Sequence, residues 1–289
     1  MYKLESINNS NLNLLNIFNL NDDYKEDIVE IVNNKNIFKK LLFIKNIKYI
    51  KLYDKYIGFI WFVKLQHQCY KIHCLKIISE YTSMEYYKAL FNLFSNASSI
   101  RISDNNLDKN LLLDLGFTIE KTILEMKKNI TSIYEDKYTF ENSHISFHVF
   151  EDGSDEVTRC SIQNVVFNSI SRQAIREEDI ICERYEKYYI PSGCIFINLD
   201  CIPIGYAQLI RKNEMIFMAN FGIIPQYRNN GYGKFLLKYM LNIASDLGVS
   251  EVYLKCDSCN RDAVKLYESE GFKRVKVCYE YKKNEKYLL

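Results

Sequence analysis

The chain lacks a charge excess of either sign. Its 289 residues include 38 lysines and arginines against 36 aspartates and glutamates, a formal net charge of +2. Proteins that bind nucleic acid or anionic membranes usually carry a strong basic field, so the composition favours neither partner. No apolar run approaches the roughly 20 residues of a membrane-spanning helix. Residues 1–6 also lack the basic-then-apolar layout of a secretion signal.

The cysteines form no recognisable metal or disulfide framework. There are nine of them, an odd number, and several lie beside or within apolar runs, which favours reduced thiols and a cytoplasmic location. His67, Cys69, His73 and Cys74 are close in sequence but do not form two separated ligand pairs, and Cys256-x-x-Cys259 has no second pair. Four-ligand structural zinc sites usually draw on two such pairs. We therefore expect no metal.

Several catalytic and nucleotide-binding motifs are also missing. No Gly-x-Ser-x-Gly elbow suggests a serine hydrolase. At the one glycine-rich turn that precedes a long helical pattern, a Walker loop would need glycine in place of Arg228 and serine or threonine in place of Phe235. A dinucleotide fingerprint would need a small residue in place of Leu236. Neither nucleotide motif fits this turn.

The turn itself predicts an anion site. An apolar strand is expected to end at Pro225, an Arg228-x-x-Gly231-x-Gly233 turn follows, and a helix continues from Lys234. Such a helix start presents free backbone N–H groups at the positive end of the helix dipole, which suits a phosphate. Gly231 and Gly233 permit backbone conformations and close approaches that a Cβ would hinder.

A second segment narrows the ligand. Residues 260–272 read Asn-Arg-Asp-Ala-Val-Lys-Leu-Tyr-Glu-Ser-Glu-Gly-Phe, one predicted helix and one strand after the turn. Together the two segments resemble the signatures of the GNAT N-acetyltransferase superfamily, [Arg/Gln]-x-x-Gly-x-[Gly/Ala] and Asn-x-x-Ala-x-x-Leu-Tyr-x-x-x-Gly-Phe. The likeness lies in the second half of the chain, and two motifs in the right order are more specific than either alone.

The resemblance implies acetyl-coenzyme A as co-substrate. It places the pyrophosphate on the turn and the pantetheine arm in the gap between the splayed fourth and fifth strands. The cofactor-binding residues that it implies are Phe221, Ile223, Arg228, Asn229, Asn230, Gly231, Tyr232, Gly233, Lys234 and Asn260.

The resemblance also assigns the catalytic acid. It places the hydroxyl of Tyr267 near the coenzyme A sulfur, where it would protonate the departing thiolate, and a backbone N–H near Ile223 would stabilise the oxyanion. The alternative is that Tyr267 only packs on its helix. The expected fourth strand, residues 215–224, holds no glutamate, and Glu214 stands just before it. We therefore expect a base that acts through water, or none.

A repeat sets the predicted architecture. Residues 56–60 parallel residues 203–207, and residues 111–117 parallel residues 266–272 around a shared Gly-Phe. A repeat on this scale predicts an α/β (α+β) protein of two tandem GNAT-like domains at residues 1–130 and 143–289. Each would be a mixed, mostly antiparallel twisted sheet flanked by helices.

The first copy is predicted to be degenerate. Residues 79–83, where its turn should lie, contain no glycine, and Glu80 would repel a phosphate. Counting back from the shared Gly-Phe aligns Asn105 with Asn260 but Leu112 with Tyr267. The first copy is expected to serve structure or substrate binding.

The predicted function is transfer of an acetyl group from acetyl-coenzyme A to a primary amine of a small molecule or peptide. Two alternatives stay open, namely another acyl-coenzyme A donor and a coenzyme A-sensing protein without turnover. The acceptor cannot be read from the sequence, and a homodimer is left open. No metal, nucleic acid or membrane partner is expected.

Overall fold

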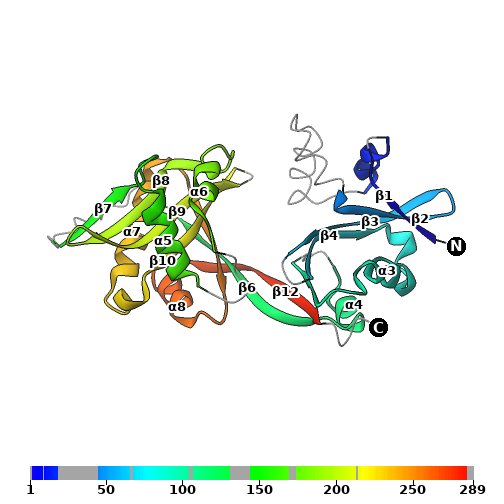
Figure 1. The fold of residues 1–289 in the computed structure, drawn as a ribbon. Coiled ribbons are helices and arrows are strands. Elements are labelled where there is room, and N and C mark those ends of the chain that lie inside the picture. The colour runs from blue at the N-terminus through cyan, green and yellow to red at the C-terminus, as the bar shows by residue number, and fades with distance from the viewer. Residues whose placement is uncertain are drawn as a thin grey trace. The chain divides into compact units, whose positions relative to one another are not determined.

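The computed structural model describes residues 2–8, 10–18, 45–65, 68–103, 107–130, 144–168, 174–212 and 214–284. The chain divides into two compact units (Figure 1). The first unit comprises Met1–Thr122 and Cys278–Leu289, and the second comprises Ile123–Val277. Each unit holds its own part of a 12-stranded sheet together with its own packed helices, which is the predicted mixed α/β fold class.

The sheet of the first unit has the strand order β1-β2-β3-β4-β5-β12-β6. Its pairs are antiparallel along β1 to β4, whereas β4 and β5 run parallel. Its elements are β1 (Tyr2–Ser6), η1 (Leu12–Ile17), β2 (Ile47–Leu52), β3 (Lys55–Lys64), β4 (Cys69–Ile77), η2 (Ser79–Tyr81), α3 (Met84–Phe91), η3 (Asn92–Phe94), β5 (Ser99–Ile102), α4 (Lys109–Asp114) and the beginning of β6 (Thr118–Asn129).

The second unit repeats this plan with the order β12-β6-β11-β10-β9-β8-β7. Strands β10 and β11 pair in parallel only from Ile216↔Val252 to Met218↔Leu254, and beyond these residues they separate as predicted. Its elements are β7 (Ile145–Val149), α5 (Glu156–Val166), α6 (Glu177–Glu183), β8 (Tyr189–Leu199), β9 (Ile202–Lys212), β10 (Met215–Ile223), η4 (Pro225–Tyr227), α7 (Tyr232–Asp246), β11 (Glu251–Asp257), α8 (Arg261–Ser269) and the beginning of β12 (Lys273–Asn284).

Helices cover both faces of the second sheet. On one face α7 and α8 bury the larger core, in which Leu236, Met240 and Ala244 recur every four residues, as a helix that turns one side to a sheet requires. On the other face Ile162 of α5 and Ile180 of α6 pack in a smaller core. The two faces therefore differ, and they are called the α7 face and the α5/α6 face below.

The closing strands β6 and β12 each begin in one unit and end in the other. Residues 123–129 of β6 pair with β11 in the second unit, and residues 281–284 of β12 pair with β5 in the first. Each sheet is thus completed by a strand from the other half of the sequence. The division at 1–130 and 143–289 follows the sequence repeat and stays a prediction, whereas the compact units exchange their last strands.

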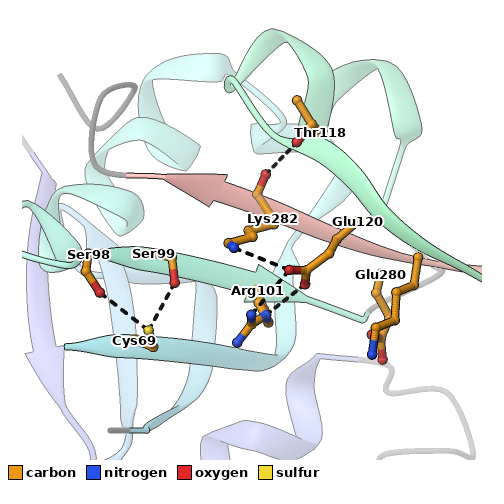
Figure 2. Close-up of polar contacts among 9 residues, drawn as sticks. Cys69, Ser98, Ser99, Arg101, Thr118, Glu120, Glu280 and Lys282 are labelled. Carbon is orange, nitrogen blue, oxygen red and sulfur yellow. Dashed lines mark hydrogen bonds and ion pairs between the residues drawn. The ribbon is translucent and has the colours of Figure 1, made fainter. Parts of the chain in front are cut away.

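Polar contacts hold the end of β12 inside the first unit (Figure 2). The main-chain oxygen of Lys282 accepts a hydrogen bond of 3.2 Å from Thr118 Oγ1. Glu120 lies 2.8 Å from Arg101 Nε and 3.3 Å from Lys282 Nζ, so one carboxylate joins β5, β6 and β12. Partly exposed ion pairs stabilise only modestly, and we attribute more of the anchoring to buried apolar area.

That apolar anchor is Tyr281, which is 3% exposed in the core of the first unit. We expect Tyr281→Ala to destabilise the first unit by about 3–5 kcal/mol, the usual cost of deleting a large buried aromatic ring. Val277→Ala on the same strand, where the side chain is 44% exposed, should change stability by less than about 0.5 kcal/mol. Denaturant unfolding of both variants checks this, and equal effects would contradict the anchoring role.

The repeat landmarks coincide in detail. Gly116 and Gly271 both end a helix with positive φ, at 82° and 85°. The next residue in each case donates its N–H back into the helix, to Leu112 O at 2.9 Å and to Tyr267 O at 3.0 Å. Leu112 therefore occupies the position of Tyr267, as the sequence count predicted.

The sequence predicts Ser154 as a helix cap, with Asp155 and Glu156 in the first turn, and a helix over 177–188 that stops before Pro191. Both boundaries were wrong. Ser154 does not cap α5; Asp155 stands at the N-cap, and Ser154 Oγ donates to Glu151 O at 3.2 Å. The helix expected over 177–188 ends at Glu183, and β8 already begins at Tyr189. Pro191 therefore lies inside β8 and not between a helix and a strand. A strand tolerates a proline at an irregularity, and β8 loses register with β9 between Tyr189 and Cys194.

None of the nine cysteines forms a disulfide. None of the helices in the described ranges is long and apolar enough to cross a membrane.

Candidate functional site

The start of α7 leaves backbone N–H groups open, and the turn of residues 228–233 that forms it is called the cradle below. Gly231 is the N-cap with φ +84°, and no side chain caps the helix. The N–H groups of Lys234 and Phe235 bond to Gly231 O at 2.9 and 3.2 Å. Within the described part of the chain, no protein acceptor takes the N–H groups of Gly231, Tyr232 or Gly233. Three donors are therefore left at the positive end of a 15-residue helix.

The shape of the turn depends on two side chains that donate hydrogen bonds to the main chain. Arg228 Nε donates to Ile223 O at 2.9 Å and Nη2 to Val166 O at 3.3 Å. Asn230 Nδ2 donates to Arg228 O at 3.0 Å. Asn229 adopts φ +64°. Arg228 thus joins the turn to the ends of β10 and α5, and the backbone is what remains to bind an anion.

Lys234 and Asn260 connect the turn with α8. Lys234 Nζ lies 3.0 Å from Glu270 Oε1, at the end of that helix. Asn260 Oδ1 accepts the N–H of Ala263 at 3.3 Å, so this oxygen caps α8. The fold therefore brings both predicted segments together, although the Asn260 oxygen is already used in the cap.

Tyr267 lies where the separated strands and α8 meet. Its side chain is 6% exposed, and its ring meets Phe221 and Phe272 edge-on, with centroids 5.8 Å apart in each pair. Burial raises the pKa of Tyr267 well above its ordinary value, and the neighbouring Cys256 adds to the shift. Burial likewise raises the pKa of the Cys256 thiol to about 11. Both groups are neutral at physiological pH.

Strand β10 has a bulge around Phe221, the residue whose ring contacts Tyr267. The register with β9 shifts between Ala219 and Gly222, and Asn220 adopts φ +49°. A Cβ on Gly222 would stand 2.2 Å from Val166 Cγ1, so only glycine fits beneath α5 here. The bulge thus lies just beyond Met218, the last residue of β10 that pairs with β11.

The first unit has no such cradle at the described positions. Ser83 caps α3, and its Oγ accepts the N–H of Glu85 at 3.3 Å. A short 3-10 helix, Ser79–Tyr81, stands where the glycine turn would be. Asn105, the predicted counterpart of Asn260, lies outside the described residues.

No group of three or more potential metal ligands occurs among the described residues. Of the four side chains considered above, His67 lies outside those residues, and His73 stacks on Trp61 with centroids 4.8 Å apart.

Sequence reasoning missed one cluster. Arg159, Glu183, Gln208 and Asn220 come from four different elements and are joined by hydrogen bonds on the α5/α6 face. The only local signal is Gln208, a polar residue inside an otherwise apolar run of β9.

One family model matches within the second half of the chain. The model of the acetyltransferase (GNAT) family matches residues 164–272. The chain is 26% identical to mycothiol acetyltransferase of Thermomonospora curvata over 164 residues, covering 56% of this chain and 55% of that protein. It is 33% identical to the N-alpha-acetyltransferase of Sulfurisphaera tokodaii over 87 residues, covering 30% and 48%. The chain thus spans about half the length of the curated relatives it matches.

Solved structures share the fold along more of the chain. A GCN5-related N-acetyltransferase from Sphaerobacter thermophilus superposes with a TM-score of 0.72 at 11% identity, covering 98% of this chain and 96% of that one. A tandem GNAT protein from the clavulanic acid biosynthesis pathway gives a TM-score of 0.61 at 9% identity, covering 83% and 82%. The segment that matches the acetyltransferase (GNAT) family model, residues 164–272, contains the turn before α7, the whole of α7 and α8.

Proposed function

We propose that the second unit transfers an acetyl group from acetyl-coenzyme A to a primary amine of a small molecule or peptide. The observation that carries this proposal is the set of three open N–H groups at Gly231, Tyr232 and Gly233, beside the gap at which Tyr267 lies. The cradle suits the pyrophosphate of coenzyme A. The names of the matched relatives, all acetyltransferases, support the same class of reaction.

Different parts of coenzyme A would contact different elements of the second unit. The backbone of the cradle binds the pyrophosphate, with Arg228, Asn229 and Asn230 shaping the turn. The pantetheine arm would follow the separated edge of β10 near Phe221 and Ile223. Lys234 and Asn260 flank the cradle from its own helix and from α8.

The chemical step needs one acid. The amine lone pair attacks the thioester carbon, the carbonyl oxygen becomes negative, and the C–S bond then breaks. A backbone N–H near Ile223 would stabilise the oxyanion. Tyr267 would give its proton to the departing thiolate, since its raised pKa keeps the proton available. The proton of the amine would leave to water, because β10 holds no acidic side chain.

The first unit is proposed to bind no coenzyme A. Its helix α3 starts with a side-chain cap, and Leu112 replaces the tyrosine. We propose that it supports the fold, above all through the exchanged strands, or contributes to acceptor binding.

The test is thiol release from acetyl-coenzyme A by the full chain with spermidine, glucosamine and a peptide with a free N-terminus. We expect amine-dependent release whose kcat does not fall between pH 7 and about 9, since the acid works in its protonated form and its pKa lies above the usual tyrosine value of about 10. Tight coenzyme A binding without release to any amine would favour the non-catalytic alternative. A kcat that falls within this pH range would exclude Tyr267 as the acid.

A further inference from the structure

A hydrogen-bonded chain of four side chains ends at the β10 bulge. Arg159 Nη2 donates to Gln208 Oε1 at 3.1 Å and also to Glu183 Oε2. Gln208 Nε2 donates to Glu183 Oε1 at 3.1 Å. Asn220 Nδ2 donates to Gln208 Oε1 at 3.0 Å. Arg159 is 2% exposed and Gln208 is fully buried, so these bonds lie away from solvent.

The charges at one end fix the direction of every bond in the chain. A guanidinium only donates and a carboxylate only accepts. A flipped Gln208 amide would turn its NH₂ toward Arg159 and its oxygen toward Glu183, which leaves two buried repulsive contacts. Gln208 must therefore present its oxygen to Arg159, and Asn220 must in turn present its NH₂ to that oxygen.

The outward atom of Asn220 is consequently its oxygen. Oδ1 accepts no hydrogen bond within the described part of the chain, and the side chain is partly exposed. Asn220 lies two residues beyond the last β10–β11 pair at Met218 and directly before Phe221. A fixed hydrogen-bond acceptor thus stands at the edge of the proposed reaction site.

This oxygen lies on the side opposite the cofactor. Gln208 is on the α5/α6 face together with Tyr206, whereas Phe221 and Tyr267 pack with the α7 face. Coenzyme A bound at the proposed cradle would enter the site from the α7 face. An acceptor can therefore approach the thioester from the α5/α6 face, where Asn220 is.

We propose that Asn220 Oδ1 binds the N–H of the acceptor amine, and that Arg159, Glu183 and Gln208 are positioning residues that hold the amide in this orientation. The proposal rests on the proposed function and adds a residue that selects the acceptor. A neutral amide oxygen suits this task, because a carboxylate at the same place would stabilise the unreactive ammonium form.

The test uses two coenzyme A adducts and the full chain. In one adduct the sulfur carries CH₂–CO–NH–propyl, and in the other the matching ketone CH₂–CO–CH₂–propyl, so they differ in one N–H. Calorimetry should show that Asn220→Gly reduces the amide-over-ketone preference about 3- to 10-fold relative to the wild type, the range of one hydrogen bond. Coenzyme A itself should bind both proteins equally. Glycine is chosen because it tolerates φ +49°.

A second pair of variants tests the positioning role. Gln208→Leu leaves Asn220 in place but removes the oxygen that holds the Asn220 amide in one orientation. The amide-over-ketone preference should therefore fall in this variant as well. Gln163→Leu removes another buried glutamine, from α5 (3% exposed), and should leave the preference unchanged. The same preference in wild type and Asn220→Gly, with normal coenzyme A affinity, would overturn this inference alone. Failure of the wild type to bind coenzyme A would overturn the proposed function and this inference with it.

Discussion

Gly231→Glu is expected to weaken coenzyme A binding at least about 100-fold. The substitution puts a carboxylate among the three open N–H groups of the cradle, where a phosphate should lie. Two like charges about 4 Å apart near a protein surface repel by roughly 4 kcal/mol, and a factor of 100 requires only about 2.8 kcal/mol. The left-handed backbone at φ +84° adds strain for any side chain.

The matched control is Gly248→Glu. Gly248 also has positive φ, at +72°, and a Cβ there would meet nothing within 4 Å. It follows the other end of the same helix, so it carries the same charge and a similar strain away from the cradle. Calorimetry with coenzyme A should give near wild-type affinity for this variant. If both glutamates weakened binding equally, the cradle would not be the pyrophosphate site.

Tyr267→Phe is expected to lower kcat about 10²- to 10³-fold while leaving coenzyme A affinity unchanged. Positioned proton transfer is typically worth a factor of 10²–10⁴, and the variant removes only the hydroxyl. Phenylalanine keeps the edge-on contacts with Phe221 and Phe272, so the site should keep its shape. Single-turnover thiol release, which isolates the chemical step, is the measurement.

Tyr239→Phe is the control for loss of a tyrosine hydroxyl in the same unit. Tyr239 lies on α7 and stacks flat on Phe147, with centroids 3.9 Å apart. Its substitution should leave kcat within about twofold of the wild type. An unchanged kcat in Tyr267→Phe would mean that this tyrosine serves packing alone, the alternative that the sequence left open.

The parts of the fold that were predictable are governed by short-range rules. The apolar spacing of α7 fixed which side it buries. Gly231 and Gly271 marked the start of one helix and the end of another because both positions need positive φ. The predicted end of α6 was wrong because local signals conflict there. The apolar and charged residues after Glu183 suit a helix, but β8 already begins at Tyr189, which pairs with Ile210 of β9.

The sequence by itself determined the local structure around the glycine turn and Tyr267. The order of turn, helix, strand and asparagine-to-tyrosine segment placed the cradle and Tyr267, since each depends on residues close together in the chain. Tertiary structure alone decided which strands the closing strands β6 and β12 pair with. The two strands occupy equivalent positions in the repeat, so the sequence repeat does not distinguish their partners. It also decided that Arg159, Glu183, Gln208 and Asn220 meet, since residues up to 61 positions apart (220 − 159) share no local pattern. Their bond directions follow from charge only once the fold has brought them together.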